Sequence, residues 1–403
     1  MNMTNDALMR YGFILTVCLS QIVNGILGYN IALLFFSLFI ILLSLENSYK
    51  FKMRFNFIIL WIIFIILSLI VTFLVKDIFL TTKTIIMITT AFLSWRAISI
   101  MSYRNIFNKI NFISANYLIL ILAFIFFILG YLGYSLIDIL GQQTRSKVGL
   151  FHESSHLFLY VGFSYCFLIF SKKVYLPSIL FFTMILLSQA TTGILIMIMA
   201  LGIFFLAKKN NIFFPVVVFL VSIIILALIK PDIIDSFIQR ISGVFAFNLQ
   251  NEEQIHLSSM VWLNGWSQAY NYLSETYWIG VGVGNMGQGS FSNLGFYSDF
   301  LLYHLGYVLN QIDGSFAASK IISELGFIGI LIVVVATVKI YKKLSIFIYM
   351  SRAGMNPSPL YAAAAIMLFI LLFVRSDGYM SIPFFIAIYF TFFKTSKRKI
   401  EGV

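Results

Sequence analysis

Residues 262–285 read WLNGWSQAYNYLSETYWIGVGVGN and lie inside a hydrophilic insert that extends from about residue 231 to residue 319. The insert is the one long interruption in an otherwise apolar sequence. The segments on either side of it are apolar enough to form membrane-spanning helices. The chain is therefore expected to have three parts: an N-terminal helical block (1–230), the insert (231–319) and a C-terminal helical block (320–403).

The composition is that of a membrane protein. About a quarter of the residues in a soluble domain are charged, whereas this chain of 403 residues is 10% charged and 61% hydrophobic. We expect an all-α integral membrane protein, a polytopic bundle of about twelve transmembrane helices with one large, mostly helical periplasmic loop. Cys18 and Cys166 fall in apolar segments, so the sequence predicts neither a disulfide framework nor a metal cluster.

Individual spans follow from the length of the apolar runs, because a helix needs about 20 apolar residues to cross a bilayer. Residues 11–45 are too long for one span, and Asn24-Gly25 and Gly28-Tyr29-Asn30 supply a turn between two short ones. Residues 174–207 predict two more short spans that reverse at 188–193. The remaining spans are predicted at about residues 56–75, 80–100, 111–134, 157–171, 212–230, 320–339, 359–374 and 380–394.

The basic residues predict the orientation of the bundle. With both termini in the cytoplasm, 19 of the 27 Lys and Arg residues lie on the inner side, which is the positive-inside pattern. The insert and a loop at 135–156 then face outward and carry all four histidines. Because the net charge of +12 is spread over alternate span ends, we expect no nucleic-acid partner.

Four basic residues lie on the outer side, against the topological trend: Arg145, Lys147, Arg240 and Arg375. Such cations would hold an anionic substrate, or they would simply keep the outer loops soluble. The pattern leaves both explanations open.

Inside the insert, apolar and aromatic residues recur at three- and four-residue steps: Leu263, Trp266, Tyr270, Leu273 and Tyr277. This spacing predicts an amphipathic helix with an aromatic face. That face would pack on the bundle, lie on the outer leaflet or stack on sugar rings. The run GVGVGN at 280–285 follows no evident strand, so we expect a tight, close-packed loop there rather than a nucleotide site.

His152-Glu153-Ser154-Ser155-His156 fits the H-E-x-x-H pattern of zinc metalloproteases. On a helix the two histidines would share one face and bind zinc, with Glu153 as general base. A third ligand is also required, and Asp377 is the candidate that the sequence offers. An intramembrane metalloprotease is therefore one alternative for this chain.

The same stretch supports a second interpretation. Residues 149–156, GLFHESSH, are similar to the G-x-F-x-E-P-S-H stretch of bacterial O-antigen and capsular polysaccharide polymerases, with Ser154 in place of the usual proline. Three further stretches resemble the same family: its G-V-G-x-G-N at 280–285, the end of its large periplasmic loop and the next span at 313–316 and 323–326, and its last periplasmic turn at 375–379. Together with the topology, the resemblance covers most of the chain.

The related O-antigen ligases differ from this chain at two places. They often carry an arginine shortly before the G-V-G-x-G stretch, where Met260 stands here. They also carry a His-Asn pair before the E-x-G, where this chain has Asp313-Gly314, with His304 further upstream. These departures favour a polymerase over a ligase and leave the catalytic base open.

The resemblance implies a glycosyltransferase of the bacterial inner membrane. It would transfer a growing glycan from undecaprenyl pyrophosphate onto a new lipid-linked repeat unit at the periplasmic face. Because that donor is already activated, no cofactor and no metal is expected. Membrane lipid, a chain-length regulator protein and a flippase would be its partners, and a lipid-linked oligosaccharide flippase is a further alternative for the chain itself.

The same resemblance implies the roles that a site would need. Fixed cations would hold the pyrophosphate as the C1–O bond breaks, a task that suits the planar fork of arginine. A base or acceptor would orient the attacking hydroxyl. The candidates are Glu153, His156, Asp313 and His304 for catalysis, Arg145, Arg240, Arg375, Lys147 and Lys320 for the pyrophosphate, and Trp262, Trp266 and Tyr270 for the glycan.

Overall fold

The computed structural model describes residues 5–27, 31–45, 62, 66, 78–103, 106–108, 110–134, 151, 153–188, 190–208, 257–287, 296–305, 311–312, 314–376 and 381–392. Apart from a single bridge residue at Phe151, the regular structure within these ranges is helical. The helices are α1 (Asn5–Leu27), α2 (Ile31–Leu45), α4 (Ile78–Tyr103), the 3-10 turn η1 (Ile106–Asn108), α5 (Ile110–Tyr131), α7 (Ser154–Phe170), α8 (Tyr175–Ser188), α9 (Thr191–Ala207), α12 (Leu257–Glu275), α13 (Phe296–Leu305), α14 (Ala317–Arg352), α15 (Pro359–Phe373) and α16 (Ile382–Phe392).

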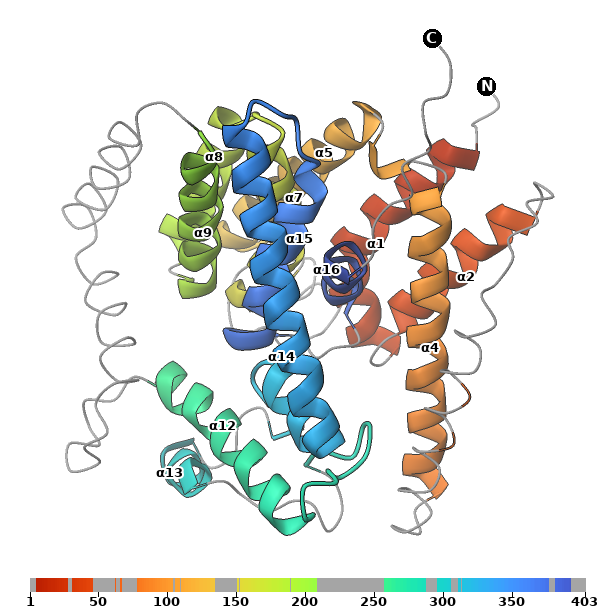
Figure 1. The fold of residues 1–403 in the computed structure, drawn as a ribbon, viewed down its shortest axis with the longest axis vertical. Helices are drawn as coiled ribbons and strands as arrows, with labels where there is room; N and C mark the ends of the chain where they lie inside the picture. Colours follow the sequence, from red (N-terminus) through yellow and green to blue (C-terminus); the bar gives the residue numbers. More distant parts are fainter. Residues whose placement is uncertain are drawn as a thin grey trace.

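The bundle is built around α7 and α15 (Figure 1). Every residue of α7 from Leu157 to Phe170 is buried, as expected for a helix that is apolar on all sides. Small residues allow close packing in this core, because a Cβ on Gly162 would lie 2.9 Å from the sulfur of Met367. The α5, α8, α9, α14 and α16 helices pack around this pair, and α1, α2 and α4 lie on the far side of α16 (Figure 1).

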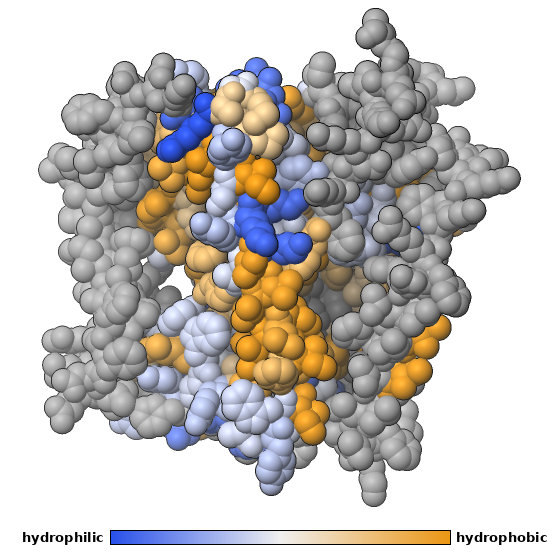
Figure 2. All heavy atoms as spheres, viewed as in Figure 1, coloured by the Kyte–Doolittle hydropathy of each residue, from blue (hydrophilic) through white to orange (hydrophobic). Residues whose placement is uncertain are grey.

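Three described helices contain segments that are long and apolar enough to cross a membrane: Ile85–Ser102, Phe112–Tyr131 and Ala317–Arg352. Shorter apolar helices accompany them. Together they indicate a membrane protein. Figure 2 shows an apolar surface over the part of α14 nearest α12, with hydrophilic side chains farther along the same helix.

Most of the predicted spans coincide with helices. The expected pair at 174–207 is confirmed as α8 and α9, and α15 and α16 match the last two predicted spans. The predicted turn is wrong at Asn24 and Gly25, because both lie inside α1, and its second part at 28–30 lies outside the described residues. The helix predicted at 320–339 extends to Arg352. The span at 212–230, and all but Ile62 and Ile66 of the span at 56–75, lie outside the described residues.

The helix α12 lies across one end of the bundle, with α13 beside it and the beginning of α14 above it (Figure 1). This confirms the predicted helix inside the insert. The prediction that its aromatic residues share one face is wrong. Trp266 and Leu273 pack on the core, whereas Tyr270 is 71% exposed and Tyr277 lies beyond the end of the helix.

The helix α14 is broken at Gly326, where φ is 60° and ψ is −133°. The break separates a buried entry segment, 317–325, from the long segment, 327–352. The backbone of the entry segment lies close to the long one, because a Cβ on Gly329 would lie 2.9 Å from the Cα of Ile322. The break therefore folds the entry segment against the helix that follows it.

Candidate functional site

Two side chains that the sequence singled out meet at the α12 end of the bundle. The Arg375 guanidinium donates from Nη2 to Oε2 of Glu153 at 2.9 Å, across 222 positions of sequence. The Ser155 hydroxyl donates to the same oxygen at 3.2 Å. The side chains of Arg375 and Glu153 are 20% and 25% exposed, so the ion pair is partly accessible to solvent.

The ends of two core helices place these charges. Glu153 is the N-cap residue of α7, with an extended backbone, and Arg375 follows the C-cap residue of α15, Val374. A carboxylate near a helix N-terminus and a cation near a helix C-terminus are both favoured by the helix dipoles. The Arg375 Nε is buried and has no hydrogen-bond partner among the described residues. The guanidinium therefore retains a donor that Glu153 does not occupy.

The backbone around Arg375 is tied to the segment that precedes α14. The Ser376 amide donates to the Ser315 carbonyl at 3.1 Å, and the Ser315 hydroxyl donates to the Val261 carbonyl at 3.0 Å. The ion pair, the start of α14 and α12 are thus joined by hydrogen bonds.

Aromatic rings support this junction from α12. Trp262 donates from Nε1 to the Phe373 carbonyl at 2.7 Å, two residues before Arg375. The ring centroids of Trp262 and Trp266 lie 5.9 and 4.8 Å from that of Phe316. Both tryptophans therefore pack towards the bundle, and among the three predicted glycan-binding residues Tyr270 is the exposed one.

The bond from Trp262 makes a testable contribution to stability. We expect Trp262→Phe to lower the free energy of unfolding by about 1 kcal/mol, because it removes one donor and keeps most of the ring packing. Trp266→Phe is the matched control, since the Trp266 indole makes no hydrogen bond within the described residues and its contact with Phe316 can persist. Thermal unfolding in detergent measures both, and equal melting temperatures for the two variants would contradict the assignment.

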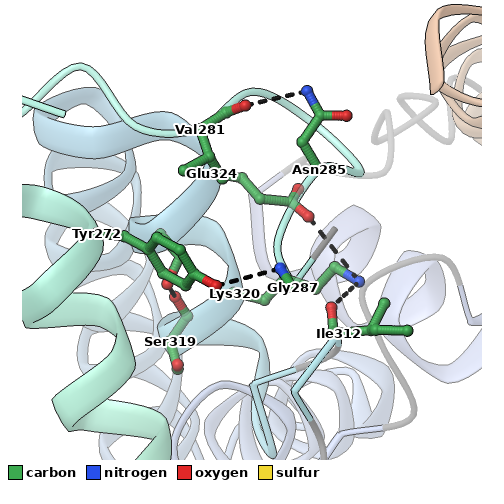
Figure 3. Close-up of polar contacts among 9 residues, drawn as sticks. Tyr272, Val281, Asn285, Gly287, Ile312, Ser319, Lys320 and Glu324 are labelled. Atoms are coloured by element: carbon green, nitrogen blue, oxygen red, sulfur yellow. Dashed lines mark hydrogen bonds and ion pairs between the residues drawn. The ribbon is translucent and has the colours of Figure 1, made fainter. Parts of the chain in front are cut away.

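A second polar cluster surrounds the entry segment of α14 (Figure 3). Lys320 donates from Nζ to the Ile312 carbonyl at 3.1 Å and lies 3.9 Å from Oε1 of Glu324. Both charged side chains are buried, so each needs the other to offset the cost of leaving water. Lys320 thereby holds the chain immediately before residue 313.

The glycine run at 280–285 caps the broken helix. The Val281 and Gly282 amides donate to the Ser323 and Glu324 carbonyls at 3.0 and 2.9 Å. These carbonyls lie at the end of the entry segment, where a helix leaves its last acceptors unsatisfied. The predicted close-packed loop is confirmed, because its amides satisfy protein carbonyls.

Tyr272 holds the far end of this loop (Figure 3). Its hydroxyl accepts a hydrogen bond from the Gly287 amide at 3.2 Å. Burial raises the pKa of the Tyr272 phenol above its usual value, while the bond from Gly287 acts in the opposite direction. The phenol therefore stays protonated at neutral pH and acts as a neutral structural group.

The structure places only some of the predicted site residues. Glu153 and Arg375 form an ion pair, His156 lies in the first turn of α7, and Lys320 lies in the neighbouring polar cluster. His304 belongs to α13, but its side chain is outside the described part. The residues that lie wholly outside it are Arg145, Lys147, Arg240 and Asp313.

Sequence analysis missed the part played by Ser315. No pattern in the sequence singled it out, yet its carbonyl and hydroxyl connect the Ser376 amide, next to Arg375, to α12. Its positive φ of 69° was not visible in the sequence. The Asp-Gly-Ser order at 313–315 was the available signal, because it is typical of a turn.

The zinc geometry predicted from the H-E-x-x-H pattern stays a prediction. Of the motif, Glu153 is the extended N-cap residue of α7, which begins at Ser154, and His156 lies in the first turn of that helix. His152 and Asp377 lie outside the described residues. Within the described ranges, no three His, Cys, Asp or Glu side chains come together.

Comparison with protein-family models, with curated proteins and with solved structures yields no match to this chain.

Proposed function

We propose that this chain is a membrane glycosyltransferase that polymerises oligosaccharide repeat units carried on undecaprenyl pyrophosphate. In this proposal about twelve spans cross the bacterial inner membrane, with both termini in the cytoplasm and the α12 end in the periplasm. The products are O-antigen or capsular polysaccharide. The donor is already activated, so the proposal includes no cofactor.

The observation that carries the proposal is the ion pair between Glu153 and Arg375. The two residues come from two of the stretches that resemble polysaccharide polymerases, 149–156 and 375–379. Their meeting places an acid and an arginine, the two group types that this reaction needs, within one hydrogen bond of each other. The buried Nε of Arg375 supplies a further donor for an anion.

In the proposed reaction, the pyrophosphate of the donor binds the Arg375 guanidinium and displaces the Glu153 carboxylate from it. Arginine binds phosphate through two parallel N–H donors, so the incoming anion competes directly with the carboxylate. Glu153 is then released to accept a proton from the sugar hydroxyl of the acceptor. Substrate binding and activation of the base are thereby coupled.

The proposed transfer needs only the donor and the acceptor as reactants. The acceptor oxygen attacks C1 of the donor glycan, a new C1–O bond forms, and the bond to pyrophosphate breaks. The proton passes to Glu153, and undecaprenyl pyrophosphate leaves with its charge held by Arg375. Arg145, Arg240 and Lys147 are proposed further contacts for this leaving group, and His156, His304 and Asp313 are proposed alternatives for the base.

Lys320 and the tryptophans take supporting roles in this proposal. Lys320 positions the backbone at Ile312 through its hydrogen bond to that carbonyl. Trp262 and Trp266 hold α12 against Phe316, while the exposed Tyr270 is the ring available to the glycan.

The experiment is reconstitution of the purified protein in proteoliposomes with synthetic lipid-linked repeat units. We expect a ladder of products that differ by one repeat and release of undecaprenyl pyrophosphate. A single transfer to a lipid A acceptor would indicate a ligase instead. Movement of the unchanged substrate across the bilayer would indicate a flippase, and either result in the absence of a ladder would overturn the proposal.

A further inference from the structure

Three large apolar side chains project from the turn that follows α12. Tyr277, Trp278 and Ile279 are 86%, 56% and 69% exposed. Tyr277 and Trp278 also have positive φ angles of 49° and 67°, a conformation that costs a residue with a side chain about 1–2 kcal/mol. The chain therefore accepts local backbone strain at the turn that presents these side chains to the surroundings.

The turn is fixed beside an exposed apolar surface of α14. The Phe327 amide donates to the Trp278 carbonyl at 2.8 Å, which joins the turn to the first residue after the break. From there an exposed apolar stripe follows one face of α14: Phe327, Ile328, Leu331, Val334, Val335 and Val338. Figure 2 shows this apolar surface over the part of α14 nearest α12.

The residues at the two ends of the apolar stripe are of types that favour the surface of a bilayer. From Phe327 to Val338 the helix rises about 17 Å, which is less than the roughly 30 Å hydrocarbon core of a bilayer. Exposed Lys339 and Lys342 follow at one end, and long basic side chains reach outward to the headgroups. At the other end the stripe continues into Trp278 and Ile279, and tryptophan and tyrosine favour the interfacial layer.

We propose that the turn at 277–279 inserts into the interface of the lipid leaflet and anchors the insert to the bilayer surface. The occupant of this exposed patch is phospholipid, because the patch continues an apolar face of a candidate membrane-spanning helix. This inference rests on α14 crossing the membrane and is independent of the proposed chemistry. The inserted turn would hold the junction between α12 and Arg375 close to the membrane surface.

Tryptophan fluorescence tests the anchor in nanodiscs that contain brominated phosphatidylcholine. The contribution of Trp278 is the difference between the native protein and Trp278→Phe. We expect shallowly brominated lipid to remove most of this contribution and aqueous acrylamide to remove little of it. The contribution of Trp266, isolated with Trp266→Phe, is the internal comparison and should resist brominated lipid, since that ring packs against Phe316.

A second measurement avoids any change to the aromatic residues. The native cysteines are buried, so a nitroxide can be attached selectively at Ile279→Cys. We expect greater accessibility to oxygen than to a water-soluble nickel complex. The reverse order, or a Trp278 emission that acrylamide quenches and brominated lipid does not, would overturn the anchor and would indicate a water-exposed or protein-covered turn.

Discussion

Replacement of Arg375 by alanine should abolish the product ladder in reconstituted membranes, with a loss in rate of about 100-fold or more. The proposed leaving group is a pyrophosphate, and Arg375 is the cation that the described structure places beside the acid Glu153. The substitution also deprives Glu153 of its ion-pair partner. Because both side chains are partly exposed, we expect the melting temperature to change little, since surface pairs contribute about 0–1 kcal/mol.

Two further variants separate charge from geometry at this pair. Arg375→Lys should restore only part of the activity, because an ammonium lacks the planar fork that binds two phosphate oxygens. Glu153→Gln retains the size of the side chain and leaves Arg375 available, so it should retain donor binding and lose turnover. If Arg375→Ala and Glu153→Gln both form ladders of normal length at the normal rate, neither residue takes part in the reaction.

Gly326→Ala should be among the most destabilising single changes in the chain, at about 3–5 kcal/mol. The φ and ψ angles of Gly326 are essentially accessible only to glycine. In addition, a Cβ there would overlap the Trp278 carbonyl oxygen, which cannot move away without breaking the hydrogen bond that it accepts from the Phe327 amide. The substitution therefore strains the break and displaces the loop that caps the entry segment.

Gly202→Ala in α9 is the matched control for this prediction. No heavy atom lies within 4 Å of the position where its Cβ would be, and alanine is favoured over glycine in a helix by about 1 kcal/mol. We expect an unchanged or slightly raised melting temperature in detergent. A Gly326→Ala protein as stable as Gly202→Ala would show that the chain tolerates a continuous helix at residue 326.

The helices themselves were predictable because their signal is local. The apolar runs at 359–374 and 380–394 agree with α15 and α16 to within two residues at each end. A helix that is surrounded by a bilayer or an apolar core is apolar on all sides, so the run of apolar residues and the helix have nearly the same length. The loop at 280–285 was also predictable, because repeated glycines favour a tight turn. The face of α12 was not, since Trp266 and Tyr270 carry the same aromatic signal and only packing against Phe316 separates them.

By itself, the sequence determined a helical chain with segments apolar enough to span a membrane, because composition and the length of apolar runs suffice for that conclusion. Only the tertiary structure decided that Glu153 meets Arg375 and that Gly326 breaks α14 against the glycine loop. Both depend on contacts between residues far apart in the chain. No local pattern encodes such contacts, since they arise when α7, α12, α14 and α15 pack around a common core.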